Sequence, residues 1–425
     1  SVPWYTTGAG TKTYMVGTLS DETIEQTVDD EIRAQYMGME EEAAKNSLLP
    51  AILWRNSVDT AKIFCVNGDY LADISAVGIL DAMMGETYDY DIYPVINAQN
   101  LVIADLPAFV SENEEEMQKR YSQSAQAVYQ EIVWPSLTSI ASRTGAKMTC
   151  MMTPQFTYTD EEEPDGENVT YYLKRLKEEH AEAGLSADSR EGIPLSEKIK
   201  QDQTFWQTYA PSYRFLSLYA DGVKSIGEKS ALPAEIRTVA LGSGASGQAV
   251  GYLNENVTLQ PSTSSGIRHT FLDDFKVKCM ETALGYSNIT LDLYSVTYPE
   301  GDEDSWEKMS KKIAANLGTY WKAYEAFDAT TLTESDVRIR RFLALDYKQQ
   351  RAGNVITLSL EHREDAAWFL LRLHGEKVTE VAGGSFEEIE DGVYLILAEE
   401  DEVSVEVQTG ETWQYQDGGK RGDGT

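Results

Sequence analysis

Short apolar runs alternate with segments of helical periodicity over most of the chain, and this alternation predicts the architecture. The runs are typical of buried strands, and the segments between them repeat apolar residues at helical spacing. Six or more β/α units in series indicate a parallel sheet, and their number favours a barrel over an open sheet. We therefore predict an α/β fold built on a (β/α) barrel, complete or incomplete. The predicted strands occupy 49–54, 61–66, 88–97, 146–152, 213–220, 236–241, 257–261 and 289–296.

The pattern changes near Gly353, where apolar and polar residues begin to alternate with a period of two. Runs of this kind, separated by glycine-rich turns, predict a small all-β sandwich. Near the start of the chain, residues 21–46 form a helical stretch that is polar nearly all round, as in a solvated connector. The predicted domains are 1–47, a connector or the remnant of a preceding domain; 48–350, the barrel; 351–410, the sandwich; and 411–425, a disordered tail.

Composition narrows the ligands that the chain can bind. Its 70 acidic and 36 basic residues give a formal net charge of −34. This charge repels phosphate groups and argues against nucleic acids and anionic lipid surfaces as partners, whereas a neutral or cationic ligand meets no such barrier. The 4 histidines are too few for a histidine-rich zinc site. Cys65, Cys150 and Cys279 lie far apart and are interpreted as buried thiols.

The sequence gives little direct information on location. No run approaches the roughly 18 apolar residues of a membrane-spanning helix, and the first residues do not form a signal peptide. The chain begins with SVPWYTTGAG and ends with WQYQDGGKRGDGT, and both ends look like internal positions of a longer protein. We expect an export signal or membrane anchor to lie outside this sequence, with membrane contact only through such segments.

A polar triplet, Asn67, Gly68 and Asp69, ends the apolar run at 63–66. Ligands bind at the carboxyl ends of parallel strands in α/β proteins, so Asp69 is a candidate site residue. The alternative is a turn that caps the next helix. Other carboxylates in or after strand-like runs could form a glycosidase pair, and aromatic residues near the same strand ends favour a carbohydrate cleft. These residues are Asp160, Asp221 and Asp292, and Tyr88, Tyr90, Tyr93, Phe156, Tyr158, Tyr219 and Tyr294.

A second candidate cluster comprises His269, Asp273 and Asp274, at the start of a predicted helix over 269–285. His269 and Asp273 are four residues apart and would share one helical face, where they could hold a metal ion or a sugar hydroxyl. The alternative is that the aspartates cap the helix and interact with its dipole.

The stretch FCVNGDYL resembles the first motif of the polysaccharide deacetylases of the NodB-homology class. The resemblance is closest to the Pel-type deacetylase domain and its uncharacterised relatives in Gram-positive bacteria. It extends loosely over residues 48–405, through LLPAILWRNS, YDYDIYPVINAQNLVIAD, CMMTPQFTYTD and LQPSTSSG. It implies a deacetylase-like (β/α) barrel and a polysaccharide ligand.

In that class the motif supplies a general base and a metal-binding aspartate, so the resemblance implies that Asp69 binds the metal and Asn67 stands at the base position. A neutral amide cannot act as the base. The class also has a motif with two histidines, but the matching segment offers Gln155, Tyr158 and other residues without histidine. The metal site implied by the resemblance therefore looks degenerate.

We accordingly predict a glycan-binding, deacetylase-like protein of exopolysaccharide biosynthesis or modification at the cell surface, with a degraded metal site. The alternatives are an active deacetylase, hydrolysing C–N amide bonds with a divalent metal such as zinc on Asp69 and His269, and a glycoside hydrolase with paired carboxylates. The expected partners are an amino-sugar polysaccharide and an exopolysaccharide synthase or export complex. The predicted ligand contacts are Asn67, Asp69, Gln155, Tyr158 and His269.

Overall fold

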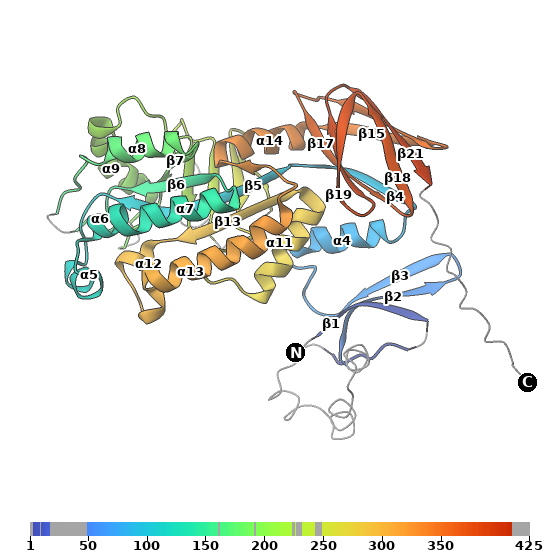
Figure 1. Ribbon diagram of the computed structural model, residues 1–425, viewed down its shortest axis with the longest axis horizontal. Helices are drawn as coiled ribbons and strands as arrows, with labels where there is room; N and C mark the ends of the chain where they lie inside the picture. The colour runs from blue at the N-terminus through green and yellow to red at the C-terminus, as the bar shows by residue number, and fades with distance from the viewer. Residues whose placement is uncertain are drawn as a thin grey trace, which may run out of the picture. The chain divides into compact units, whose positions relative to one another are not determined.

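The computed structural model describes residues 3–8, 10–17, 49–159, 162–190, 193–222, 226, 232–242 and 249–409 (Figure 1). The chain forms two compact units, Ser1–Thr87 and Tyr88–Thr425. The helix predicted at 21–46 and the tail predicted at 411–425 lie outside the described residues. None of the described helices is long and apolar enough to cross a membrane.

The first unit contains a three-stranded antiparallel sheet and one helix. Strands β1 (Thr11–Val16), β2 (Ala51–Val58) and β3 (Ala61–Val66) pair in that order, and α4 (Ser75–Gly85) follows. The runs at 49–54 and 61–66 were expected to be parallel barrel strands, and this prediction is wrong. Only two residues join β2 to β3, and such a short connection permits a hairpin but no parallel crossover.

The second unit is built on a ten-stranded sheet with the order β10-β11-β9-β8-β7-β6-β5-β13-β12, in which β14 also pairs with β5. Every pair is parallel except β10 with β11. The strands predicted at 146–152, 213–220, 236–241, 257–261 and 289–296 contribute to this sheet. The bounds are β5 (Ala98–Ala108), β6 (Met148–Thr153), β7 (Glu182–Ser186), β8 (Ser217–Ala220), β9 (Thr238–Leu241), β10 (Gly251–Asn254), β11 (Val257–Pro261), β12 (Ser264–Ser265), β13 (Tyr286–Asp292) and β14 (Ala329–Thr330).

The sheet is curled into a half-barrel. Strands β5 and β11 are separated by β6, β7, β8 and β9, and neighbouring strands lie about 4.8 Å apart. Nevertheless the side-chain amide of Asn100 on β5 donates to Gln260 Oε1 on β11 at 3.0 Å. Side chains so far apart in strand order meet only if the sheet curves strongly around them. The prediction of an α/β fold with a barrel-like parallel sheet is therefore confirmed at this level, as a half-barrel.

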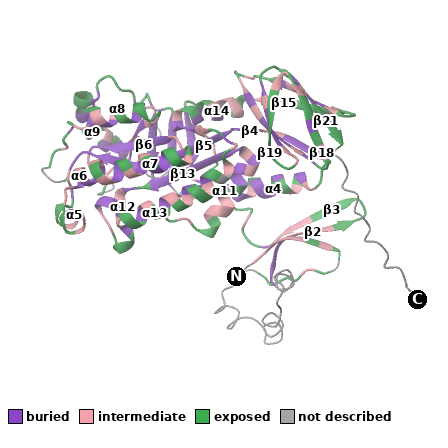
Figure 2. Ribbon diagram, in the orientation of Figure 1, coloured by how far each residue is buried: buried purple, intermediate pink, exposed green. Residues whose placement is uncertain are grey.

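Helices pack on the outer face of the half-barrel, and Figure 2 shows the buried strands between them. The largest apolar core lies in this layer, where Trp134, Leu137, Tyr172, Trp306 and Met309 are buried together. One helical segment runs without a gap from Ala125 to Thr144 and is π-helical just before Pro135. The helices are α5 (Glu114–Tyr121), α6 (Ala125–Val128), the π-helical η1 (Tyr129–Val133) and η4 (Leu317–Trp321), α7 (Trp134–Thr144), α8 (Val169–Glu178), α9 (Leu195–Tyr209), α11 (Phe271–Leu284), α12 (Tyr294–Thr297), the 3-10 helices η3 (Asp302–Asp304) and η5 (Lys322–Tyr324), α13 (Trp306–Asn316) and α14 (Leu332–Ala344).

Helix α14 closes the amino end of the half-barrel. Gln260 on β11 donates to the Leu332 carbonyl oxygen at 2.9 Å, and the Leu332 amide donates to Thr149 Oγ1 on β6 at 3.0 Å. Thr258 Oγ1 on β11 donates to the buried carboxylate of Asp336 at 2.6 Å. Because the helix seals this end, a ligand of the half-barrel has access to the carboxyl ends of the strands.

Two four-stranded antiparallel sheets complete the second unit. Their orders are β15-β16-β21-β18 and β19-β20-β17-β4, and residues of both sheets, such as Leu358 and Phe369, share one core. The run at 88–97 was expected in the barrel, but β4 pairs with β17, with Leu370 opposite Tyr93. The bounds are β4 (Tyr90–Val95), β15 (Asp346–Ala352), β16 (Val355–Glu361), β17 (Ala367–Leu373), β18 (Glu376–Ala382), β19 (Gly384–Glu390), β20 (Val393–Ala398) and β21 (Glu402–Thr409).

Candidate active site

Four aspartates, which we call the aspartate cluster, stand at the carboxyl edge of the half-barrel. They are Asp105 near the end of β5, Asp188 two residues after β7, Asp221 directly after β8 and Asp292 at the end of β13. In the sheet, Asp292 lies opposite Ala104, the neighbour of Asp105. The parallel strands therefore bring together carboxylates that are far apart in the sequence.

Asp105 is the most deeply buried member of the aspartate cluster, with no exposed surface. Its backbone is in the left-handed region, with φ at 60°. Ser186 Oγ donates to Asp105 Oδ1 at 2.6 Å, while Oδ2 is buried and has no hydrogen-bond partner among the described residues. Burial raises the pKa of Asp105 well above its ordinary value, and the charges of Asp188 and Asp292 raise it further. Burial therefore favours the protonated form of this carboxyl group.

Asp188 has a pKa suited to proton transfer. Burial, followed by the charges of Asp292 and Asp221, raises its pKa to about 7. A side chain with a pKa near the working pH can both donate and accept a proton. Solvent reaches Asp292, but the surrounding protein weakens its solvation, and this is the main cause of its raised pKa. Asp188 is thus the best-placed general acid or base of the cluster.

Gly242, after β9, leaves space for this arrangement. A Cβ atom at Gly242 would lie 2.7 Å from Asp221 Oδ1 and 2.7 Å from the Tyr219 hydroxyl. Both distances are shorter than non-bonded contact allows. The absence of a side chain at Gly242 therefore lets Asp221 and Tyr219 occupy their places at the edge.

A buried ion pair supports the cluster. Lys198 on α9 has no exposed surface, and its Nζ donates to Asp202 Oδ2 and to Thr153 Oγ1, each at 3.0 Å. Tyr158 receives a third hydrogen bond from Lys198 and donates its own hydroxyl hydrogen to Asp202 Oδ1 at 2.7 Å. The positive charge of Lys198 lowers the pKa of Asp105 and of Asp188, against the larger effect of burial.

Tyrosines line a hollow of about 400 Å³ beside Asp292, which we call the tyrosine hollow. Tyr294 and Tyr298 stack with ring centroids 4.9 Å apart, and the Arg190 guanidinium lies 4.5 Å from the Tyr298 ring centroid. The flat, partly apolar faces of such rings suit the C–H face of a sugar. The residues lining the hollow are Ser265, Ile267, Arg268, Asp273, Asp292, Tyr294, Ser295, Tyr298 and Glu300.

Glu112 fixes the loop after β6 next to this hollow. Its Oε1 accepts from the backbone amides of Phe156 and Thr157, both at 2.9 Å, and its Oε2 accepts from the Tyr298 hydroxyl. Burial, ahead of the hydrogen bond to Glu112, raises the pKa of Tyr298 to about 12. Tyr298 therefore stays neutral and is held in place.

The structure places three predicted contacts in the second unit. Tyr158 belongs to the buried Lys198 network, so its role there is structural. Gln155 has a buried Oε1 with no partner among the described residues. His269 precedes α11, its Nδ1 lies 2.6 Å from Ser264 Oγ, and its ring stacks on Tyr320 with centroids 3.5 Å apart. Burial lowers the pKa of His269, which favours the neutral imidazole.

The other two predicted contacts belong to the first unit. The Asn67 side chain is buried and donates to the carbonyl oxygens of Pro3 and Ala51, at 2.8 and 3.0 Å, so it joins segments of that unit. The Asp69 side chain is exposed. The assignment of Asn67, Asp69, Gln155, Tyr158 and His269 as ligand contacts stays a prediction.

A metal centre was predicted on Asp69 and His269. Among the described residues, no three or more His, Cys, Asp or Glu side chains are grouped so that they could hold a metal ion. His269 Nε2 is buried and has no partner within the described part of the chain, so it could serve as one donor, but zinc usually takes four. Asp273, the proposed neighbour of His269, instead caps α11 by accepting from the Thr270 amide and hydroxyl at 2.8 and 2.7 Å. The capping alternative for Asp273 is therefore confirmed.

One family model matches part of the chain. The family DUF2194, described as an uncharacterised protein conserved in bacteria, matches residues 23–191, less than half of the chain. No curated protein matches. The finer resemblance to the Pel-type domain stays a prediction.

Three solved structures are similar to this chain at low identity. A proposed polysaccharide deacetylase from Mycobacterium smegmatis has 8% identity and a TM-score of 0.34, over 57% of this chain and 90% of that one. A proposed glycoside hydrolase or deacetylase from Parabacteroides distasonis has 10% identity and a TM-score of 0.34, over 66% and 82%. The endo-β1,6-glucanase BT3312 has 9% identity and a TM-score of 0.30, over 81% and 90%. At these scores, none of them assigns an activity to this chain.

Sequence reasoning found half of the aspartate cluster. Asp221 and Asp292 were singled out as strand-end carboxylates, whereas Asp105 and Asp188 were missed. The signal for Asp105 was present, because it ends the apolar run in NLVIADL. Asp188 was hidden, because the residues before it, VTYYLKRLKEEHAEAG, have a helical pattern throughout. In the structure α8 ends at Glu178 and β7 begins at Glu182. Asp160 lies outside the described residues.

Proposed function

We propose that the protein is a carbohydrate-active hydrolase that performs acid–base chemistry on a glycan at the aspartate cluster. The observation that carries this proposal is the convergence of four carboxyl groups on one open edge. Among them, Asp105 has a raised pKa and a buried Oδ2 without a partner among the described residues, and Asp188 has a pKa of about 7. Glycoside hydrolysis typically needs one carboxyl group as an acid and another as a base or nucleophile.

The surroundings of each aspartate in the cluster suggest which catalytic role it would have. Asp188, with its pKa near neutrality, would protonate the leaving oxygen of the glycosidic bond. The exposed Asp221 at the neighbouring strand end would act as the base or nucleophile. Asp105 would hold the edge in place by accepting the hydrogen bond from Ser186. The tyrosine hollow beside Asp292 would accept a sugar ring by stacking.

The charge of the chain supports a neutral or cationic glycan over a polyanion. A net charge of −34 and four clustered aspartates disfavour phosphorylated or highly acidic polymers. From the sequence resemblance we further propose that the glycan contains amino sugars and that the protein acts in exopolysaccharide production at the cell surface with a synthase or export complex. We also propose that the metal site implied by the resemblance, with Asp69 as a ligand and Asn67 at the base position, is degraded. Deacetylation with a divalent metal is the second candidate, and glycan binding without catalysis is the third.

One experiment separates these functions. Purified protein is incubated with neutral glucans and with acetylated amino-sugar polymers, and reducing ends and free acetate are measured in parallel. We expect reducing ends that depend on Asp188, so that Asp188→Asn abolishes them while the exposed Asp391→Asn leaves them unchanged. Acetate without reducing ends would support the deacetylase, particularly if a chelator abolished its release. Glycan binding with neither product would leave only the binding role.

A further inference from the structure

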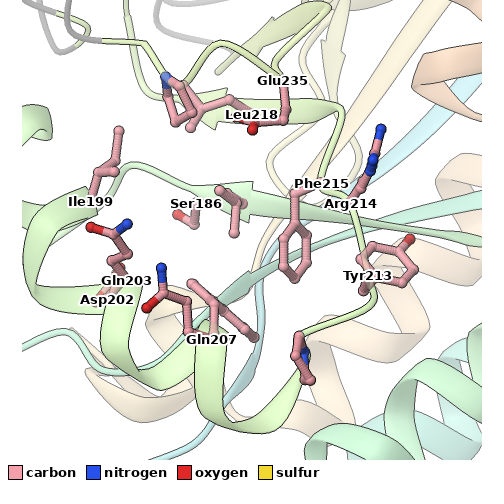
Figure 3. Close-up of a pocket in the computed structure, with 14 residues that line it drawn as sticks. Ser186, Ile199, Asp202, Gln203, Gln207, Tyr213, Arg214, Phe215, Leu218 and Glu235 are labelled. Carbon is pink, nitrogen blue, oxygen red and sulfur yellow. The ribbon is translucent and has the colours of Figure 1, made fainter.

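A second cavity lies on the outer face of the half-barrel, and neither the acid–base chemistry nor the predicted contacts use it. Its volume is about 670 Å³, and it lies between α9, the start of β8 and the segments at 211–215 and 233–235 (Figure 3). Leu218 faces this cavity, while the next residue, Tyr219, packs in the core inside the curled sheet. Successive strand residues face opposite sides of a sheet, so the cavity opens on the outer side.

The floor of this cavity is apolar and aromatic. Trp206 and Phe215 are largely buried and lie with ring centroids 4.8 Å apart, and Leu218 is fully buried beside them. Tyr213 extends the aromatic surface and is anchored, because its hydroxyl accepts from the Ala183 amide at 3.0 Å. The floor is therefore rigid and can pack against a flat, weakly polar ring face.

The rim is polar and unsatisfied within the described part of the chain. Gln203 and Gln207 are one helical turn apart on α9, and both project toward the space that Phe215 faces (Figure 3). Arg214 and Glu235 are also at the rim. Among the described residues these four side chains have no hydrogen-bond or ion-pair partner. One positive and one negative charge leave the rim close to neutral, in contrast to the aspartate cluster.

We propose that this cavity, the α9 pocket, binds a neutral saccharide of one or two rings. Such a ligand has an apolar C–H face for Trp206 and Phe215, and hydroxyl groups that match the donors and acceptors of Gln203 and Gln207. The volume lies in the range of small-ligand sites, about 300–1,000 Å³. The choice of a saccharide rests in part on the proposed function, since a glycan substrate would supply such units.

The α9 pocket also contacts residues that support the aspartate cluster. Asp202 is nine-tenths buried in the pocket wall and accepts from Lys198 and Tyr158. Ser186, which donates to Asp105, lies at the pocket as well. The pocket would therefore hold a second part of the glycan close to, but separate from, the site of chemistry.

The test uses fluorine NMR of the full chain labelled with 5-fluorotryptophan. The chain has 8 tryptophans, and the Trp206 signal is assigned from Trp206→Phe. We expect the neutral trimers of glucose and of N-acetylglucosamine to shift this signal saturably. The paired change Gln203→Ala and Gln207→Ala should weaken this binding about tenfold, as expected for the loss of two hydrogen bonds. Gln201→Ala, on the same helix outside the pocket, should leave it unchanged.

The outcomes distinguish a failure of the pocket proposal from a failure of the proposed function. A Trp206 signal that does not move with either trimer at tens of millimolar, or that moves equally in the paired variant, would overturn the pocket. All four protein forms also carry Asp188→Asn, so that no turnover disturbs the titration. Binding by the Asp188→Asn forms, combined with no release of reducing ends by the wild-type protein, would support the pocket while refuting the hydrolase.

Discussion

Polar side chains at the two ends of the half-barrel have different surroundings. At the amino end, Asn100, Thr258 and Gln260 meet α14, and their hydrogen bonds pair donors with acceptors inside the protein. At the carboxyl end, Asp105 is buried with a partnerless Oδ2 among the described residues, next to other carboxylates. Buried polar groups with hydrogen-bond partners stabilise a fold, whereas buried carboxyl groups that lie next to one another and have shifted pKa values are typical of functional sites.

The largest expected effect is on chemistry at the carboxyl end. Asp188→Asn should lower the hydrolysis rate by about 10²–10⁴-fold, because the general acid is lost. The free energy of unfolding at pH 8 should not fall, because the variant removes a charge that burial disfavours. Reducing-end assays and urea unfolding on the same samples check both statements. An active Asp188→Asn protein would remove Asp188 from the mechanism.

At the amino end we expect a substitution to lower stability and to leave the rate of hydrolysis unchanged. Asp336→Ala removes the carboxylate that accepts from the buried Thr258 hydroxyl, which keeps only Thr238 Oγ1 at 2.9 Å. It also breaks the ion pair between Asp336 Oδ1 and Arg340 Nε at 2.9 Å. We expect a loss of about 2–4 kcal/mol in the free energy of unfolding. The rate per folded molecule should stay unchanged. Asp346→Asn, on an exposed strand, is the control. A stable Asp336→Ala protein would show that α14 does not depend on this contact.

The raised pKa of Asp188 at the carboxyl end should also make the free energy of unfolding depend on pH. Asp188 has a higher pKa in the folded chain, about 7, than its ordinary value of 3.8, so the folded state binds this proton more tightly. Its contribution to the free energy of unfolding should therefore fall between about pH 4 and pH 7, by about 1–3 kcal/mol after allowance for partial exposure.

Urea unfolding from pH 5 to pH 8 measures this contribution as the difference between wild type and Asp188→Asn. Burial raises the pKa of Glu281 to about 7 as well, so the slope of the wild type alone does not identify Asp188. Identical slopes in the two proteins would contradict the assignment.

The smallest expected effect on activity comes from adding a side chain at Gly242. Gly242→Ala places a Cβ atom 2.7 Å from Asp221 Oδ1, so Asp221 must move. We expect a severalfold loss of activity and a destabilisation of about 1–2 kcal/mol. Gly251→Ala is the matched control, since nothing lies within 4 Å of its added Cβ. Equal activities of the two variants would indicate that Asp221 takes no part in the reaction.

Hydrophobic pattern predicts strands better than it predicts their partners. The runs at 146–152, 236–241 and 257–261 are parallel strands of the half-barrel, because strands buried on both faces are continuously apolar. The runs at 49–54, 61–66 and 88–97 have a similar texture but pair antiparallel in other sheets. Local periodicity records how deeply a strand is buried, while its partner depends on segments that are distant in the sequence.

The same limit applies to the candidate site. Strand-end position was enough to select Asp221 and Asp292, because the carboxyl ends of parallel strands form one edge. It could not select Asp188, whose strand was masked by helix-forming residues in the stretch KEEHAEAG. The pKa values that distinguish Asp105 and Asp188 arise from burial and from mutual repulsion, which no local pattern contains. Asp105 could have been found from the run NLVIAD by the reasoning that selected Asp292.

The pairing of β4 with β17 has a consequence for biosynthesis. Val95 ends β4 and Ala367 begins β17, so a ribosome must add the long intervening segment before β4 meets its neighbour. At about 5–20 residues per second, this wait lasts roughly 15–50 s. During that time the apolar strand has an unpaired edge on the nascent chain, which makes it a natural binding site for a molecular chaperone.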